Sequence, residues 1–307
     1  MSQIQTIDST PPYISIFLKQ NMDQLIHIYD EGIKENKEGC LRFECSEKEN
    51  KMDVFDFIKQ AYDLKFDGVD FNSKHIKSTN KDYLRKIKQE CIKHGLVISC
   101  IGISNSFSKL DEPVDNAINE VKKWIDVAYY LGAPIVRVFA GGATPENLNL
   151  AWNRAVQGLS EVSEYGQKAG IRVSLQNHNH TGIIKTGNDV LKMLNDVGSN
   201  LGYIMDTGQY AGSPGASGGE LNSDFDFYKS MDQTAHLASL VRVKLYYGGS
   251  EASGIKNVHM DYTRIFQLLK KVKFNGFISL VYEGLDDEFQ SVIRGNIELR
   301  KHLQKIN

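Results

Sequence analysis

The residues best suited to chemistry lie between Gly170 and Tyr210, where two short apolar segments each run into polar side chains. The segments read IRVSLQNHNHTG and LGYIMDTGQY, with an amphipathic run between them. In an α/β protein with a parallel sheet, polar residues just past the strand ends line the ligand crevice. The sequence therefore predicts a site here, with the first candidates Gln176, Asn177, His178, His180, Asp206 and Gln209.

The elements that must position these residues alternate along the chain. Short apolar segments are typical of buried strands, and they lie at 40–45, 68–72, 96–104, 134–142, 171–178, 201–208, 240–247 and 277–284. Amphipathic runs predict helices at 54–64, 82–95, 117–132, 151–170, 189–198, 262–274 and 290–303. Several of these runs end in glycine, which supplies the left-handed turn that stops a helix.

This alternation predicts a (β/α)8 TIM barrel of the α/β class as a single domain over residues 40–307. Residues 1–39 carry apolar side chains at helical spacing and predict a helical N-terminal extension. The competing fold is an open doubly wound sheet. It is disfavoured because the sequence has no GxGxxG after the first strand and no GxxxxGKS or GxxxxGKT.

Composition narrows the partners and the compartment. The 307 residues have a formal net charge of −2, which gives no reason to expect nucleic acid or a membrane surface as a partner. Four scattered cysteines predict buried reduced thiols rather than a disulfide framework; they are Cys40, Cys45, Cys91 and Cys100. Neither a leader pattern nor a membrane-length apolar run is present, so we expect a cytoplasmic protein.

Five motifs in order carry a resemblance to a known family. PIVRVFAGG, VSLQNHNHTG, IMDTGQY, VRVKLYY and DYTRIFQLLKKVKFNGFISLVYEG resemble the sugar phosphate isomerase/epimerase family, the xylose-isomerase-like TIM barrels that include family-2 apurinic endonucleases. The resemblance runs from about Cys40 to the end. It implies one divalent metal at the top of the barrel, held by a Glu of the fifth strand, an Asp of the sixth, a His of the seventh and a Glu of the eighth. It also implies that the two glutamates act as acid and base.

This chain departs from that pattern at most of the implied ligands. The four positions hold Gln176, Asp206, Arg242 and Val281, and a companion His three residues after the Asp is Gln209. A divalent site of oxygen and nitrogen ligands needs carboxylates and neutral imidazole, whereas arginine is a permanent cation. An amide cannot take a proton as a glutamate does. We therefore carry over neither the family's metal nor its pair of catalytic glutamates.

Two alternatives to the family's metal site stay open. Side chains two apart on a strand share a face, so His178, Asp206 and Glu283 could form a displaced site for Mn, Mg, Co or Zn. Alternatively, Arg242 could stand in for the metal by pairing with Asp206, with Lys244 as base or second cation.

Structural roles compete with these functional ones. His178 and His180 could simply be hydrogen-bonding loop residues. Arg137 could contact substrate, or it could be a buried arginine paired with Asp70 or Glu44.

We therefore expect an isomerase or epimerase that moves a proton beside a carbonyl of a sugar or polyol-like small molecule. The candidate catalytic residues are Lys244, His178, Glu283 and Arg242. The candidate substrate-binding residues are Gln176, Arg137, Asp206, Gln209 and His180. The alternative is a catalytically degenerate carbohydrate-binding barrel, and a homo-oligomer stays open. The nuclease branch is disfavoured because it needs more metal ligands and a basic groove.

Overall fold

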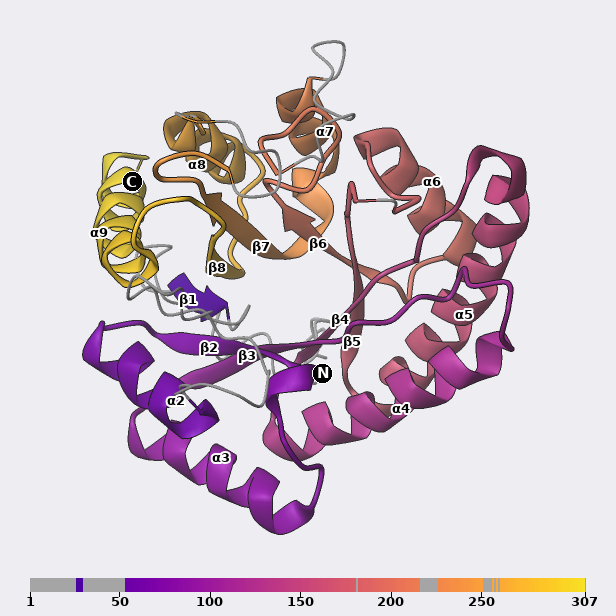
Figure 1. Cartoon of the computed structure of the whole chain (residues 1–307), viewed down its shortest axis with the longest axis horizontal. Helices are drawn as coiled ribbons and strands as arrows, with labels where there is room; N and C mark the ends of the chain where they lie inside the picture. Colours follow the sequence, from indigo (N-terminus) through magenta and orange to yellow (C-terminus); the bar gives the residue numbers. More distant parts are fainter. Residues whose placement is uncertain are drawn as a thin grey trace, which may run out of the picture.

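The computed structural model describes residues 26–29, 53–180, 182–215, 226–250, 256, 258 and 260–306. Eight parallel strands close into a barrel in the order β1-β2-β3-β4-β5-β6-β7-β8, and the helices surround it (Figure 1). The strands are β1 Ile26–Tyr29, β2 Gly68–Asn72, β3 Val97–Gly102, β4 Ile135–Val138, β5 Arg172–Gln176, β6 Gly202–Asp206, β7 Ala238–Leu245 and β8 Phe277–Tyr282. The predicted (β/α)8 barrel is confirmed.

The helices follow the strands and begin and end at residues suited to these positions. They are α2 Val54–Asp63, α3 Lys81–Lys93, α4 Val114–Leu131, α5 Leu148–Ala169, α6 Gly187–Val197, α7 Phe227–Thr234, α8 Tyr262–Lys271 and α9 Glu288–Ile306. Asp53 caps α2 by accepting hydrogen bonds from the backbone N–H groups of Phe55 and Asp56. Gly132 and Gly170 end α4 and α5 with left-handed φ angles of 85° and 73°, as the glycine pattern predicts.

The first strand corrects one prediction. Ile26–Tyr29 lies inside the range expected to be a helical extension, yet it pairs in parallel with both β2 and β8 and closes the barrel. Four residues can satisfy helical and strand spacing alike, and the two neighbouring strand edges decide between them. The rest of residues 1–39, and the segment 40–45 expected as first strand, lie outside the described residues.

Two apolar regions flank the barrel wall. The larger one packs the helices against the outside of the strands. The smaller one is separate and takes inward-facing residues from five strands, namely Cys100, Ile135, Ile204, Leu240 and Phe277. It forms an apolar layer inside the barrel. Any inward-facing polar group further along the strands therefore lies above this apolar layer, which we call the apolar floor.

The described thiols and the surface agree with the composition. Cys91 and Cys100 are free and buried, while Cys40 and Cys45 lie outside the described residues. Burial, reinforced by nearby Glu90, raises the pKa of the Cys91 thiol to about 12.

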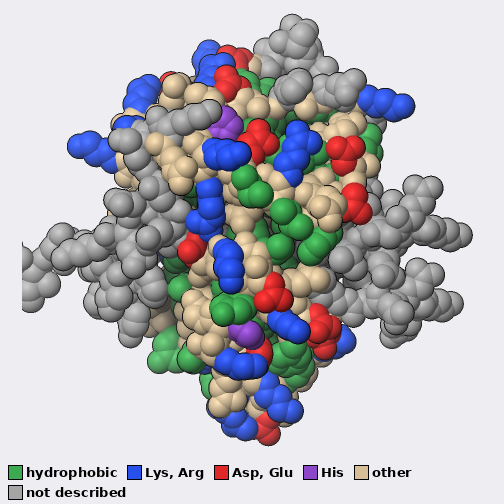
Figure 2. Space-filling model, turned by 90° about the vertical axis from the view of Figure 1, so that its left-hand side faces the viewer, with side chains coloured by type: hydrophobic (Ala, Val, Ile, Leu, Met, Phe, Trp, Pro, Cys, Tyr) green, Lys and Arg blue, Asp and Glu red, His purple; other side chains and the backbone are tan. Residues whose placement is uncertain are grey.

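Figure 2 shows basic and acidic side chains interspersed on one face. In the described part of the chain, no helix combines the length and apolarity needed to cross a membrane.

Candidate functional site

Charged side chains occupy the barrel interior one layer above the apolar floor. Arg137, Asp206 and Arg242 each follow a floor residue of their strand by two positions, which keeps them on the inward face. Their exposed fractions are only 2%, 0% and 1%. Charges this deeply buried need partners of opposite sign or hydrogen bonds to remain charged.

Two hydrogen bonds and one ion pair join three side chains of β5, β6 and β7 into a ring. The Gln176 Nε2 donates to Asp206 Oδ2 at 2.8 Å, and an Arg242 NH1 donates to Gln176 Oε1 at 2.6 Å. The same Arg242 NH1 lies 3.8 Å from Asp206 Oδ2. The amide thus bridges the guanidinium and the carboxylate, because it can donate to one and accept from the other.

A second cation, Lys244 of β7, also approaches Asp206. Lys244 Nζ lies 3.7 Å from Asp206 Oδ2 and donates to a carboxylate oxygen of Glu283. Glu283 follows directly after β8, at the C-terminal mouth of the barrel. The Lys244 side chain is 1% exposed and that of Glu283 is 21% exposed. The pair therefore reaches solvent through the carboxylate.

Asn177 fixes the backbone of Asp206 from both sides. Its Nδ2 donates to the Asp206 carbonyl oxygen at 2.9 Å, and its Oδ1 accepts from the Asp206 N–H at 2.9 Å. The Gly208 N–H donates to Asp206 Oδ1 at 3.1 Å. These bonds leave the Oδ2 atom turned toward Gln176 and the two cations, and they set the position of the carboxylate.

A buried chain of hydroxyl groups supports Asn177, and no pattern in the sequence indicated it. Tyr203 donates to Asn177 Oδ1 at 2.9 Å and meets the Tyr210 hydroxyl at 2.5 Å, which in turn meets the Thr234 hydroxyl at 2.6 Å. Burial raises the pKa of both tyrosines. Their hydroxyls therefore stay protonated, which suits positioning rather than proton abstraction.

A cavity of about 240 Å³ opens over the ends of β3, β4 and β5 and includes Gln176, His178 and His180 in its lining. The His178 ring centroid lies 4.9 Å from that of Phe139 and 5.2 Å from that of His180. Asn105, Ser106 and Phe139, which also line the cavity, were missed in the sequence. Their places just past β3 and β4 were the available signal.

Arg137 is not part of the cavity lining. Its NH1 donates to the Ile103 carbonyl oxygen at 3.2 Å, and its guanidinium carbon lies 4.3 Å from the centroid of the Phe139 ring. Gly102 lies so close that a Cβ there would be 2.4 Å from an Arg137 nitrogen. Arg137 therefore packs against the loops that follow β3 and β4, and its contact with substrate stays a prediction.

The two expected partners of Arg137, Asp70 and Glu44, and the candidate Gln209 have different surroundings. Asp70 accepts a hydrogen bond from the Ser279 hydroxyl at 3.1 Å, while Glu44 lies outside the described residues. Gln209 is 4% exposed, and among the described residues its Oε1 has no hydrogen-bond partner. A buried acceptor of this kind suits a ligand or a water molecule.

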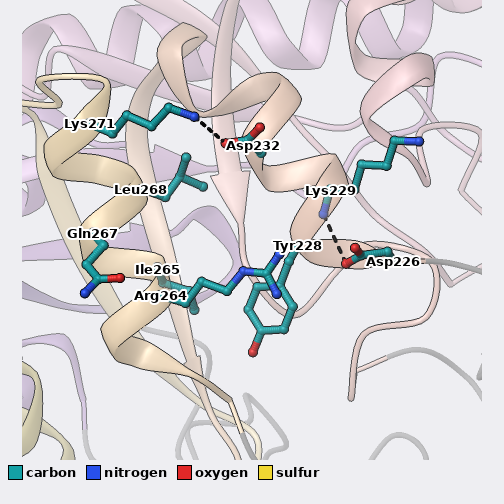
Figure 3. Close-up of a pocket in the computed structure, with 9 residues that line it drawn as sticks. All are labelled: Asp226, Tyr228, Lys229, Asp232, Arg264, Ile265, Gln267, Leu268 and Lys271. Atoms are coloured by element: carbon teal, nitrogen blue, oxygen red, sulfur yellow. Dashed lines mark hydrogen bonds and ion pairs between the residues drawn. The ribbon is translucent and has the colours of Figure 1, made fainter.

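A larger cavity, of about 480 Å³, lies on the outside of the barrel between α7 and α8 (Figure 3). Its charged side chains engage neighbours: the Arg264 guanidinium carbon lies 4.3 Å from the Tyr228 ring centroid, and Lys271 Nζ lies 3.1 Å from Asp232 Oδ1. Its lining comes from α7, α8 and the residue before α7 and includes none of the candidate residues, so we place the candidate site at the barrel mouth.

The residues at the family's metal position do not fit a divalent cation. Arg242 puts a fixed positive charge beside Gln176 and Asp206, where the ion's own charge would lie. Among the described residues, no three His, Cys, Asp or Glu side chains are grouped to hold a metal. The structure thus does not assemble the displaced set, since His178 lines the cavity whereas Glu283 contacts Lys244.

Comparison with known proteins places the chain among barrels of one family. The family model described as xylose isomerase-like TIM barrel matches residues 58–299. This chain therefore belongs to the xylose isomerase-like TIM barrel family. No curated protein sequence matches it.

Solved structures similar to this chain include sugar epimerases. The 3-keto-D-glucoside 4-epimerase of E. coli has a TM-score of 0.67 at 11% identity, covering 91% of this chain and 99% of its own. The D-psicose 3-epimerase of Clostridium cellulolyticum H10 with D-tagatose has a TM-score of 0.65 at 13% identity, covering 92% of this chain and 98% of its own. A xylose isomerase-like TIM barrel protein from Mycobacterium smegmatis in complex with magnesium has a TM-score of 0.64 at 16% identity, covering 92% of this chain and 97% of its own. Identities this low show the shared fold alone.

Proposed function

We propose that this protein is a sugar isomerase or epimerase that moves a proton beside a carbonyl of a carbohydrate or polyol-like small molecule. The proposal rests on the pair of Lys244 and Glu283, an acid–base couple at the mouth of a barrel whose structural neighbours include sugar epimerases. In TIM barrels, the C-terminal ends of the strands carry the catalytic groups.

Each charged group has a role in this reaction. Glu283 is the more exposed partner, so it would take the proton from the carbon beside the carbonyl. The negative charge that develops on the carbonyl oxygen would be stabilised by Lys244, with Arg242 behind it. Return of that proton from Glu283 to the neighbouring carbon of the enediolate completes the transfer. A catalytic role for His178, which lines the cavity and not the Lys244–Glu283 pair, stays a prediction.

The polar lining supplies the substrate contacts. Gln176 and His180 in that lining, and the buried Oε1 of Gln209 outside it, offer donors and acceptors that suit hydroxyl groups. Asp206 orients the two cations, and the Arg137 guanidinium packs on the Phe139 ring. A cytoplasmic location and homo-oligomerisation stay predictions.

Hydrogen exchange tests the proposal without knowledge of the product. A panel of aldoses and ketoses is incubated with the protein in D2O, and deuterium at the carbon beside the carbonyl is followed by NMR. We expect exchange with at least one sugar, reduced roughly 100-fold or more in Glu283→Gln and Lys244→Met. Glu164→Gln, which changes an exposed carboxylate on α5, is the matched control. Absence of exchange in the wild type, or full activity in Glu283→Gln, would refute the proposal.

A carbohydrate-binding barrel without catalysis is the second candidate. It is favoured by the two positions where the family resemblance implies glutamates: Gln176 is committed to the ring, and Val281 is 1% exposed and aliphatic. Saturable sugar binding by calorimetry, with no deuterium exchange for the same sugar, would establish this alternative.

A further inference from the structure

The place that the family resemblance gives to a divalent metal is taken by cations of the chain itself. Gln176, Asp206 and Arg242 stand at three of the four implied ligand positions. Gln176 is hydrogen-bonded to the other two, which form an ion pair with each other. Lys244 approaches the same Asp206 oxygen at 3.7 Å. The fourth position, Val281, faces Lys244 in the β7–β8 register and offers no ligand atom.

These replacements depend on one another chemically. Asp206 has an exposed fraction of 0%, so its charge requires a counter-charge. A guanidinium supplies that charge, but it also demands an acceptor, which the Gln176 Oε1 provides at 2.6 Å. A glutamate at position 176 would have no N–H to donate to Asp206 and would place two carboxylates side by side. The amide at position 176 therefore matches the arginine at position 242.

We propose that Gln176, Arg242 and Val281 replace the family's metal site as a unit, with Arg242 as a built-in cation. The wild-type protein then holds no divalent ion at Asp206, and restoring the three implied ligands creates a site that does. This inference rests on family membership and on the ring, and it is independent of the proposed sugar chemistry.

Titration of Mn²⁺ into chelator-stripped protein tests it by calorimetry and by thermal unfolding. We expect no stoichiometric heat for the wild type, and the same melting temperature in Mn²⁺ and in EDTA. The triple variant Gln176→Glu, Arg242→His, Val281→Glu should bind one Mn²⁺ per chain and melt higher in Mn²⁺ than in EDTA. Adding Asp206→Asn to this triple variant is the matched control, and it should abolish both effects.

Two results would overturn the proposal: stoichiometric Mn²⁺ binding by the wild type that Asp206→Asn removes, or a folded triple variant that binds no Mn²⁺. The single variant Gln176→Glu tests the coupling even if the triple variant does not fold. It should melt below the wild type in EDTA because Asp206 loses its donor and gains a like charge. An unchanged or higher melting temperature would show that the amide and the arginine are not coupled.

Discussion

Replacing Arg242 by methionine would leave Asp206 as a buried carboxylate with weakened compensation. The guanidinium nitrogen lies 3.8 Å from Asp206 Oδ2, and two unit charges at that separation attract by about 4 kcal/mol at an effective dielectric constant near 20. Removing one partner of a buried ion pair costs about 3–5 kcal/mol. Methionine keeps much of the apolar volume, so the cavity contribution is small. We expect a loss of about 4 kcal/mol in the free energy of unfolding.

Urea unfolding followed by circular dichroism measures this loss, and a double-mutant cycle assigns it. Asp206→Asn in the Arg242→Met background removes the uncompensated charge, so the double variant should be more stable than the sum of the two single losses allows. Lys168→Met is the matched control. It breaks an exposed pair on α5 with Glu164, in which the side chains are 72% and 60% exposed, and it should change the free energy far less.

The reasoning would be wrong if Arg242→Met cost no more than Lys168→Met, or if the effects at positions 242 and 206 were additive. Additivity would mean that the guanidinium and the carboxylate do not sense each other. Lys244, at 3.7 Å, would then be the counter-charge of Asp206.

Three further perturbations probe the support of the site. Asn177→Ala removes both hydrogen bonds to the Asp206 backbone; leaving those buried groups without partners should cost about 3 kcal/mol in urea unfolding, whereas a loss near zero would show that water replaces the side chain. Gly102→Ala places a Cβ 2.4 Å from an Arg137 nitrogen and should destabilise the barrel by about 2 kcal/mol, unless the guanidinium moves freely. The third perturbation is alkylation of Cys91 at pH 8, with the other three cysteines replaced by alanine. The thiol should react about 1000-fold more slowly in the native chain than in the urea-unfolded chain, because the fold raises its pKa to about 12. Equal rates would contradict its burial. Because the neutral thiol is favoured in the fold, its contribution to stability should be present below pH 9 and lost as the pH rises from about 9 to 12.

Much of the architecture could be predicted from local patterns. Alternating apolar and amphipathic segments gave the barrel, and glycines such as Gly132 and Gly170 marked the helix ends. Spacing by two along a strand placed Arg242 and Lys244 on one inward face, where the structure finds both near Asp206. These inferences succeed because strand periodicity and helix termination are properties of a few neighbouring residues.

The tertiary structure decided what depends on contacts between strands. Ile26–Tyr29 became β1 because open edges of β2 and β8 were there to pair with it. The amide of Gln176 bridges Asp206 and Arg242, and His178 turns to Phe139 while Glu283 pairs with Lys244. The order of residues along the chain does not fix these partners. The register between strands and the closure of the barrel determine which inward side chains lie within hydrogen-bonding distance of one another.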